Sequence, residues 1–92
     1  MLEKEIEKKL VKEVKEKGGL CLKFVSPGVV GVPDRIVLLP KGRLAFVELK
    51  SAGKKPRPVQ LKRMKELKEL GFQCHTIDEK NKIGEIIDGI EN

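Results

Sequence analysis

Three residues of this chain could carry out chemistry together. Asp34 follows Pro33 at the start of one apolar run, and Glu48 and Lys50 close the next one. Two carboxylates that meet in a folded chain suit Mg²⁺, which is usually bound through one or two carboxylates, waters and substrate phosphates. A lysine beside them could orient or deprotonate a water, or stabilise charge on a phosphorus centre. The pattern predicts metal-dependent phosphodiester hydrolysis, and a surface hairpin with solvated charges is the competing interpretation.

A β-hairpin would bring these side chains together. Residues 34–39 and 43–50 read as two strands because Pro40-Lys41-Gly42 between them is typical of a turn. Glu48 and Lys50 are two positions apart and should therefore point to the same face of their strand. The second strand is apolar on both faces before Glu48, as in a central strand covered on both sides. Two acids in so sheltered a place repel each other and lose hydration, which favours a bound cation.

The rest of the chain predicts elements that would complete a sheet with helical cover. Apolar residues recur at helical or strand spacing, and Gly18, Gly71 and Pro58 mark element ends. The predicted strands are residues 20–25, 34–39, 43–50 and 72–77, and the predicted helices are residues 2–17, 58–70 and 83–90. Cys21 and Cys74 fall in strands and are expected to be small buried residues. The single histidine, His75, is expected to have a structural or edge role.

The residues that carry the chemistry also resemble a known signature. Residues 31–34, Gly-Val-Pro-Asp, are followed after a 13-residue gap by Glu48-Leu-Lys50, which looks like the PD-(D/E)xK nuclease motif. More narrowly, the chain resembles the stand-alone VRR-NUC domain, found in phage and bacterial proteins and fused to larger repair nucleases. The similarity covers nearly the whole chain and includes the N-terminal helix, residues 18–19, 23–28, 31–35 and 46–50, and Gln60.

The resemblance implies an α/β fold, with a restriction-endonuclease-like αβββαβ core, a mixed central sheet flanked by helices, and a C-terminal helix in addition. It implies DNA cleavage that depends on Mg²⁺ or Mn²⁺ and leaves 5′-phosphate ends. Asp34 and Glu48, with the main-chain carbonyl of Leu49, would bind the metal. Lys50 would activate water for in-line attack on phosphorus. Gln60, in the first turn of its helix, would reach the metal-bound water or Lys50.

An acid of the first helix could also reach the metal through a water molecule, as often happens in the wider nuclease group. Glu5, directly before Ile6, is our choice over Glu3 and Glu7. A solvated helix charge is an equally good interpretation of Glu5.

The charge balance predicts a polyanionic partner. Lys and Arg number 20 against 14 Asp and Glu, which leaves a net charge of +6. Seven cations near the predicted site are expected to contact DNA phosphates: Lys23, Arg35, Lys54, Lys55, Arg57, Lys62 and Arg63. Lys23 could instead extend from the sheet edge into water, and the 51–58 loop could be merely solvated. The alternating Lys and Glu of the first helix are expected to be a solvated face.

The length of 92 residues predicts a single domain over 1–92 with a modest core. Paired cuts in two strands would then need two chains, so a homodimer is expected. No base-reading element is recognisable, and the resemblance suggests branched, cruciform or Holliday-junction DNA. The alternative function is a catalytically inactive DNA-binding or architectural module. No apolar run approaches ~20 residues and no signal peptide is evident, so we expect no membrane association and a cytoplasmic protein, in the host cytoplasm if phage-encoded.

Overall fold

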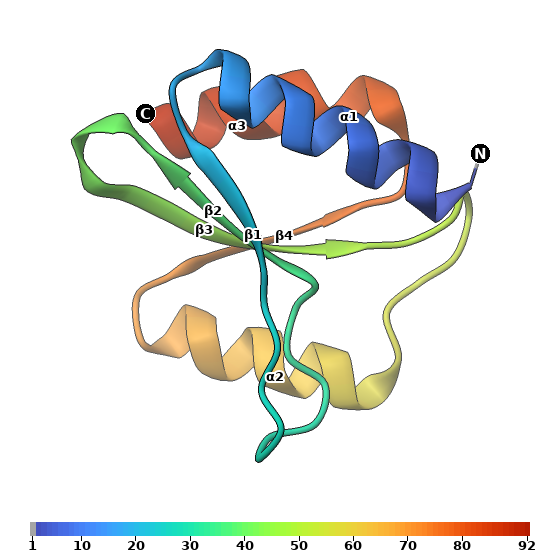
Figure 1. The fold of residues 1–92 in the computed structure, drawn as a ribbon. Coiled ribbons are helices and arrows are strands. Elements are labelled where there is room, and N and C mark those ends of the chain that lie inside the picture. The colour runs from blue at the N-terminus through green and yellow to red at the C-terminus, as the bar shows by residue number, and fades with distance from the viewer. Residues whose placement is uncertain (1) are drawn as a thin grey trace.

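A four-stranded sheet lies between two helical layers in the computed structural model, which describes residues 2–92 (Figure 1). Helices α1 (Glu3–Glu16) and α3 (Ile83–Glu91) cover one face of the sheet, and α2 (Pro58–Glu69) covers the other. The strands are β1 (Leu20–Lys23), β2 (Arg35–Leu39), β3 (Arg43–Leu49) and β4 (Gln73–Ile77), and two short 3-10 turns are η1 (Pro40–Gly42) and η2 (Lys80–Lys82).

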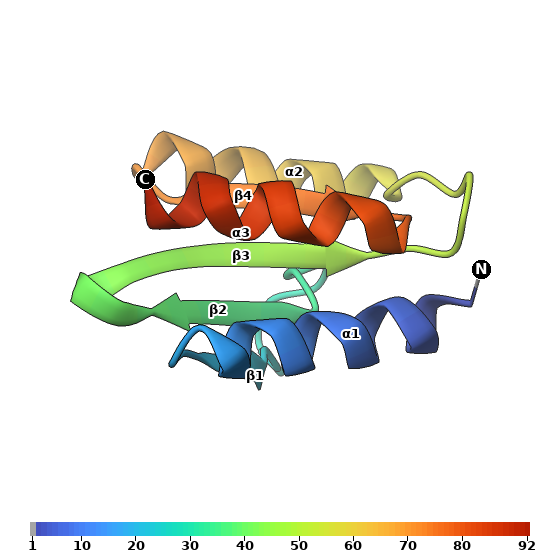
Figure 2. The same cartoon turned by 90° about the horizontal axis from the view of Figure 1, so that it is seen from above.

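The strand order in the sheet is β1-β2-β3-β4 (Figure 2). The first three strands pair antiparallel, and β4 pairs parallel to β3 after the crossover through α2. This topology confirms the expected mixed sheet and αβββαβ order with an added C-terminal helix. The first strand is shorter than the predicted range of 20–25, since β1 ends at Lys23. Since β3 and β4 run in the same direction, both end at the same side of the molecule.

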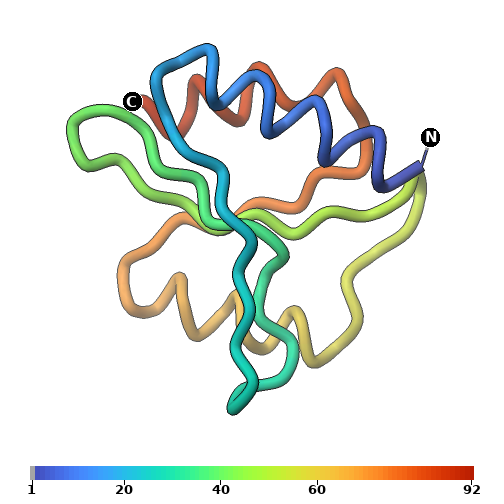
Figure 3. The backbone as a smooth tube through the Cα atoms, viewed as in Figure 1, coloured from blue at the N-terminus to red at the C-terminus, as the bar shows by residue number. Residues whose placement is uncertain are grey.

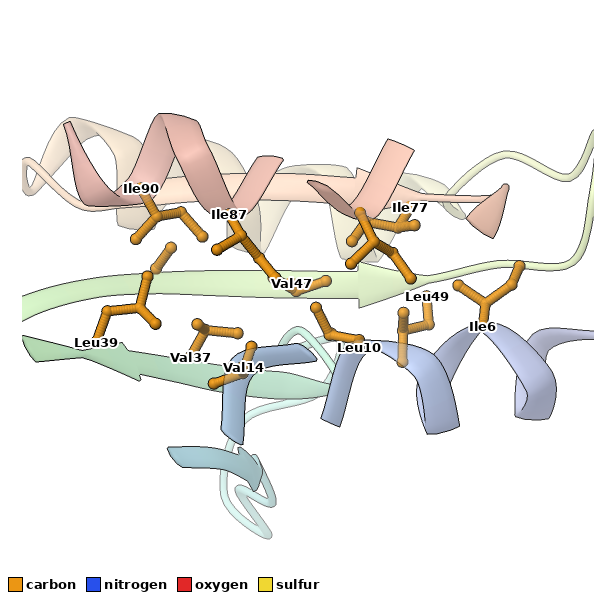
Figure 4. Close-up of a cluster of buried hydrophobic side chains, with 12 residues drawn as sticks. Ile6, Leu10, Val14, Val37, Leu39, Val47, Leu49, Ile77, Ile87 and Ile90 are labelled. Carbon is orange, nitrogen blue, oxygen red and sulfur yellow. The ribbon is translucent and has the colours of Figure 1, made fainter. Parts of the chain in front are cut away.

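The larger core lies between the sheet and the layer formed by α1 and α3 (Figure 4). The helical stripe of Ile6, Leu10 and Val14 is fully buried there, as its spacing predicts. On β3, Val47 and Leu49 point into this core. Phe46, directly before Val47, points to the other face and packs with Met64 of α2 and Cys74 of β4. Because side chains alternate along a strand, Glu48 and Lys50 share the α2 face with Phe46.

The two ends of the sheet differ in what surrounds them. The turn that joins β2 to β3 projects at one end, and the N-terminal part of α1 lies at the other, near the end of β3 (Figures 1 and 3). Ile6 of α1 packs in the same cluster as Leu49, the last residue of β3. The residues that follow β3 therefore emerge beside the start of α1.

Both cysteines and the single histidine lie on the edge strands β1 and β4. Cys21 and Cys74 are free thiols on β1 and β4, with Cys21 half-buried and Cys74 buried. His75 is half-buried on the edge strand β4, where its Nε2 lies 3.0 Å from Gln73 Oε1. Within residues 2–92, no helix is both long enough and apolar enough to cross a bilayer.

Candidate active site

Asp34 and Glu48 lie opposite each other across the β2–β3 pair. The last register pair of these strands is Arg35 with Val47, so one step further along the antiparallel pairing sets Asp34 against Glu48. Residues directly opposite in such a pair share a face, with Cβ atoms roughly 5 Å apart. The carbonyl of Asp34 also accepts a 2.9 Å hydrogen bond from the Phe24 amide, which extends the β1 pairing. The hairpin therefore brings the two acids together on the α2 face.

The Asp34 carboxylate is fixed by the backbone of β3. Its Oδ2 accepts a hydrogen bond of 2.8 Å from the Leu49 amide. In an extended strand the N–H and C=O of one residue point to the same edge, so the Leu49 carbonyl is directed toward the side where Asp34 lies. The next amide, that of Lys50, points the other way and donates to the Ile77 carbonyl at 3.0 Å. Strand geometry thus places a carboxylate and a main-chain carbonyl together.

Glu48 is a buried acid without hydrogen-bond donors. Its side chain is 1% exposed, and neither carboxylate oxygen accepts a hydrogen bond from the residues that the structure describes. Lys50 Nζ lies 3.2 Å from Glu48 Oε2. The two groups form an ion pair, but their orientation does not satisfy the angles of a hydrogen bond. Burial, followed by the charge of Asp34, raises the pKa of Glu48 to about 7, against the lowering effect of Lys50.

This donor set fits a divalent cation. A buried carboxylate that accepts no hydrogen bond at either oxygen is costly, and a cation next to it would satisfy those oxygens and neutralise the repulsion from Asp34. Across residues 2–92, no three acidic, Cys or His side chains converge as a ready-made metal site. The candidate set is therefore Asp34, Glu48 and the Leu49 carbonyl, with remaining positions open to water and substrate.

Glu5 does not join this set directly. It is exposed near the N-terminus of α1, and its Oε2 accepts a 3.3 Å hydrogen bond from the Leu2 amide, which stabilises the first turn of the helix. Its carboxylate lines a surface groove with lysines of α1. A contact from Glu5 to the metal through water stays a prediction. Glu7, one of the alternatives to Glu5, pairs instead with Arg35, at 3.0 Å from its Nε.

Gln60 lies in the first turn of α2, on the helix that covers the Glu48 face. It is 8% exposed, and its Oε1 accepts a 2.8 Å hydrogen bond from the Arg57 amide, as in the return half of a capping box. This bond fixes the side chain and leaves its amide nitrogen as a donor. Sequence reasoning gave Gln60 a catalytic role and missed this structural one, although Gln at the third helical position after a Pro start is a recognisable capping signal.

Gly31, the first residue of the Gly-Val-Pro-Asp segment, lets the chain before Asp34 approach α2 closely. Gly31 has φ +86°, and a Cβ there would lie 2.9 Å from both Cγ2 and the carbonyl oxygen of Val59. The segment leading into Asp34 can therefore pack directly against the first turn of α2, next to Gln60. Arg63 also holds this segment to α2, because its Nε donates to the Val30 carbonyl at 2.7 Å.

Four of the predicted DNA-contacting cations are exposed. Lys54, Lys55 and Arg57 are in the loop between β3 and α2, and Lys62 is on α2 itself. Arg63 is half-buried and bonds Glu66 at 3.1 Å in addition to the Val30 carbonyl.

Lys23 and Arg35 lie on the other face of the sheet. Lys23 pairs in register with Arg35, and Arg35 pairs with Val47, whose side chain points into the core under α1. The Arg35 side chain is 12% exposed, and it bonds both Glu7 and the Cys21 carbonyl at 3.0 Å. Phosphate contacts by Lys23 and Arg35 stay predictions, since the structure separates both side chains from the carboxylates by the sheet.

Two known proteins are similar to this chain over most of its length. A phage protein named "Putative nuclease p44", from Acyrthosiphon pisum secondary endosymbiont phage 1, is 53% identical over 76 residues, which cover 83% of this chain and 82% of that protein. A solved structure named "VRR_NUC domain" superposes with a TM-score of 0.87 at 29% identity, over 94% of both chains. No protein-family model matches the chain. From the fold and the two relatives together, the chain belongs to the VRR-NUC family of nuclease domains in the PD-(D/E)xK superfamily.

Proposed function

We propose that this nuclease is an endodeoxyribonuclease that depends on Mg²⁺ or Mn²⁺ and hydrolyses phosphodiester bonds. The observation that carries the proposal is Glu48, a buried carboxylate with no hydrogen-bond donor, set opposite Asp34 and 3.2 Å from the Lys50 ammonium. A purely structural hairpin has no need of a buried carboxylate that accepts no hydrogen bond, because such a group is destabilising. Asp34, Glu48 and the Leu49 carbonyl are the proposed metal ligands.

A bound Mg²⁺ would supply charge neutralisation and polarisation at the scissile phosphate. Asp34 is pre-oriented for this by the Leu49 amide, which holds one carboxylate oxygen and leaves the other free. Lys50 Nζ is placed to stabilise negative charge that develops on the phosphate oxygens, or to orient the attacking water. The amide nitrogen of Gln60, whose Oε1 is held by Arg57, is the proposed further donor to the metal-bound water or Lys50.

The proposed substrate is DNA, with a preference for branched, cruciform or Holliday-junction forms. Exposed Lys54, Lys55, Arg57 and Lys62 would hold backbone phosphates beside the carboxylates. The family resemblance supports structure selectivity, and the phage relative supports action in the cytoplasm of an infected host cell.

We further propose that one folded domain spans residues 1–92 and that two chains associate. Paired cuts in two strands need two sites. The edge strand β1 supports such association, because it has one unpaired edge and exposes Leu20 and Leu22, at 59% and 45%. Sedimentation equilibrium should then give twice the chain mass of 10.3 kDa, and a monomer at working concentration would remove the dimer from the proposal.

The test compares a four-way junction, a linear duplex and a single strand of matched sequence, each with Mg²⁺, Mn²⁺ or EDTA. We expect cleavage of the junction above the other two substrates, with either metal and not with EDTA. Equal cleavage of all three substrates would contradict the proposed preference for branched DNA, and it would still support nuclease activity. Tight junction binding without cleavage in either metal would instead indicate a DNA-binding module.

A further inference from the structure

Helix α1 has four exposed lysines that form no ion pair within residues 2–92, and they are Lys4, Lys8, Lys12 and Lys15. Lys8 and Lys12 are four residues apart, so they lie on the same side of the helix, where like charges repel. The ion pairs among residues 2–92 involve other cations; on α1 itself, Lys9 pairs with Glu13 at 2.7 Å. A helix face with this repulsion is more stable when an anion lies against it.

Lys8 and Lys12 line a shallow groove between α1 and the η2 turn. The groove has a volume of about 400 Å³, and its lining is Glu5, Lys8, Lys9, Lys12 and Lys80. Lys9 Nζ donates to the Lys80 carbonyl at 3.2 Å, so two walls that are 71 residues apart in sequence are tied together. The one acid of the lining, Glu5, accepts a hydrogen bond from the Leu2 amide. The groove is therefore a preformed concave surface with an excess of positive charge.

The two walls of the groove, α1 and the η2 turn, both lie close to the end of β3. On one wall, Ile6 packs in the cluster that contains Leu49, and Lys8 follows two residues later (Figure 4). On the other wall, Lys80 comes three residues after Ile77, the register partner of Leu49. The groove thus lies on the α1 side of the sheet, near the end of β3, where Asp34 and Glu48 lie on the α2 side.

We propose that this groove binds backbone phosphates of a nucleic acid outside the cleavage site, with Lys8 and Lys12 as the principal contacts and Lys80 on the facing wall. The inference rests on the proposed action on DNA and extends it to a second face of the molecule. Phosphate binding by two exposed lysines releases counterions from the nucleic acid. DNA that reaches the carboxylates would then be held on both sides of the end of the sheet, by the 54–57 loop and by α1.

The test uses the double variant Lys8→Gln/Lys12→Gln, since Gln keeps helix propensity and removes only the charges. The matched control is Lys41→Asn/Arg43→Gln, which removes the same charge from exposed positions at the opposite end of the sheet. Asn suits position 41 because its φ is +69°. Affinity for a fluorescent DNA duplex is measured by anisotropy in EDTA at several salt concentrations, so that binding is read without cleavage.

We expect the slope of log affinity against log salt to fall by about 1 to 2 in the double variant, since each lost phosphate contact removes roughly 0.9. The control should keep the wild-type slope, and thermal unfolding should show both variants folded. A double variant with the wild-type slope, equal losses in both variants, or a wild-type protein that does not bind DNA would each overturn the inference. Failure of the proposed nuclease activity is distinguishable from these outcomes, because the wild-type protein would then bind DNA normally and not cut it in Mg²⁺.

Discussion

The Leu49 amide donates a 2.8 Å hydrogen bond to the carboxylate of Asp34, and this one contact joins the start of β2 to the end of β3. The same carboxylate is a proposed metal ligand. Asp34 therefore has a structural role through one oxygen and a proposed chemical role through the other. The two roles can be separated by substitution.

Asp34→Asn should keep the fold and lose cleavage, because the Asn carbonyl can still accept from Leu49 while the negative charge is gone. Asp34→Ala should stay folded and lose cleavage as well, but with an unfolding free energy lower by about 1–3 kcal/mol, since a partly buried backbone donor loses its acceptor. Urea unfolding and plasmid nicking on both variants check this. Equal stability of the two variants would show that the Leu49 contact contributes little.

Glu48 should make the metal-free protein less stable as pH rises from about 4.5 to about 7. Its pKa is raised from 4.5 in the unfolded chain to about 7 in the folded one. Within that window the unfolded chain has lost the proton and the folded chain keeps it, so stability falls by up to about 3 kcal/mol. Urea unfolding in EDTA across this range measures the slope.

The matched variant for this effect is Glu48→Gln, which cannot titrate. It should show a flatter profile, unfold at higher urea than wild type above pH ~7, and fail to cut DNA. Mg²⁺ should raise the thermal midpoint of wild type and leave that of Glu48→Gln unchanged, because binding to the folded state alone stabilises it. A profile as steep as that of wild type would assign the pH dependence to another group.

Gln60 has a capping role and a proposed catalytic role that respond differently to two substitutions. Gln60→Glu keeps an acceptor for the Arg57 amide and should retain stability, whereas Gln60→Ala should lose about 1 kcal/mol. Both lack the side-chain amide donor, so both should cleave more slowly. Full activity in Gln60→Glu would mean that the side chain acts only as a cap.

Gly31→Ala should destabilise the protein more than Gly42→Ala. Both glycines have positive φ, at +86° and +74°, so each alanine carries a backbone strain of about 1 kcal/mol. Only at Gly31 would the new Cβ also contact Val59 at 2.9 Å, whereas at Gly42 the space is open. Thermal unfolding of the two variants isolates the packing term. Equal losses would show that the loop yields without displacing α2.

Much of the fold could be predicted from local patterns. The Ile6, Leu10 and Val14 stripe is a helical period, and the two-faced apolar run before Glu48 indicates a central strand; both are confirmed by burial. The approach of Asp34 to Glu48 also follows from hairpin pairing, because a single turn sets the register. These features depend on neighbours in sequence or on one short connection.

Contacts between distant elements could not be predicted in this way. Arg35 pairs with Glu7 across 28 residues, and the choice of Arg35 as a DNA contact did not anticipate that its charge is neutralised there. The groove between Lys8 and Lys80 likewise requires the packing of α1 against the chain that follows β4. A sequence that alternates Lys and Glu on α1 does not show which lysines have partners in the fold.

The central claim is that Asp34, Glu48 and Lys50 form one metal-dependent cleavage site. The most direct measurement is Mg²⁺-dependent cutting of a four-way junction by wild type and by Asp34→Ala, Glu48→Ala and Lys50→Ala, with junction binding by gel shift beside it in EDTA. The account predicts that each substitution abolishes cutting while junction binding is largely kept. Substantial cutting by any of the three variants, with its dependence on Mg²⁺ intact, would contradict it.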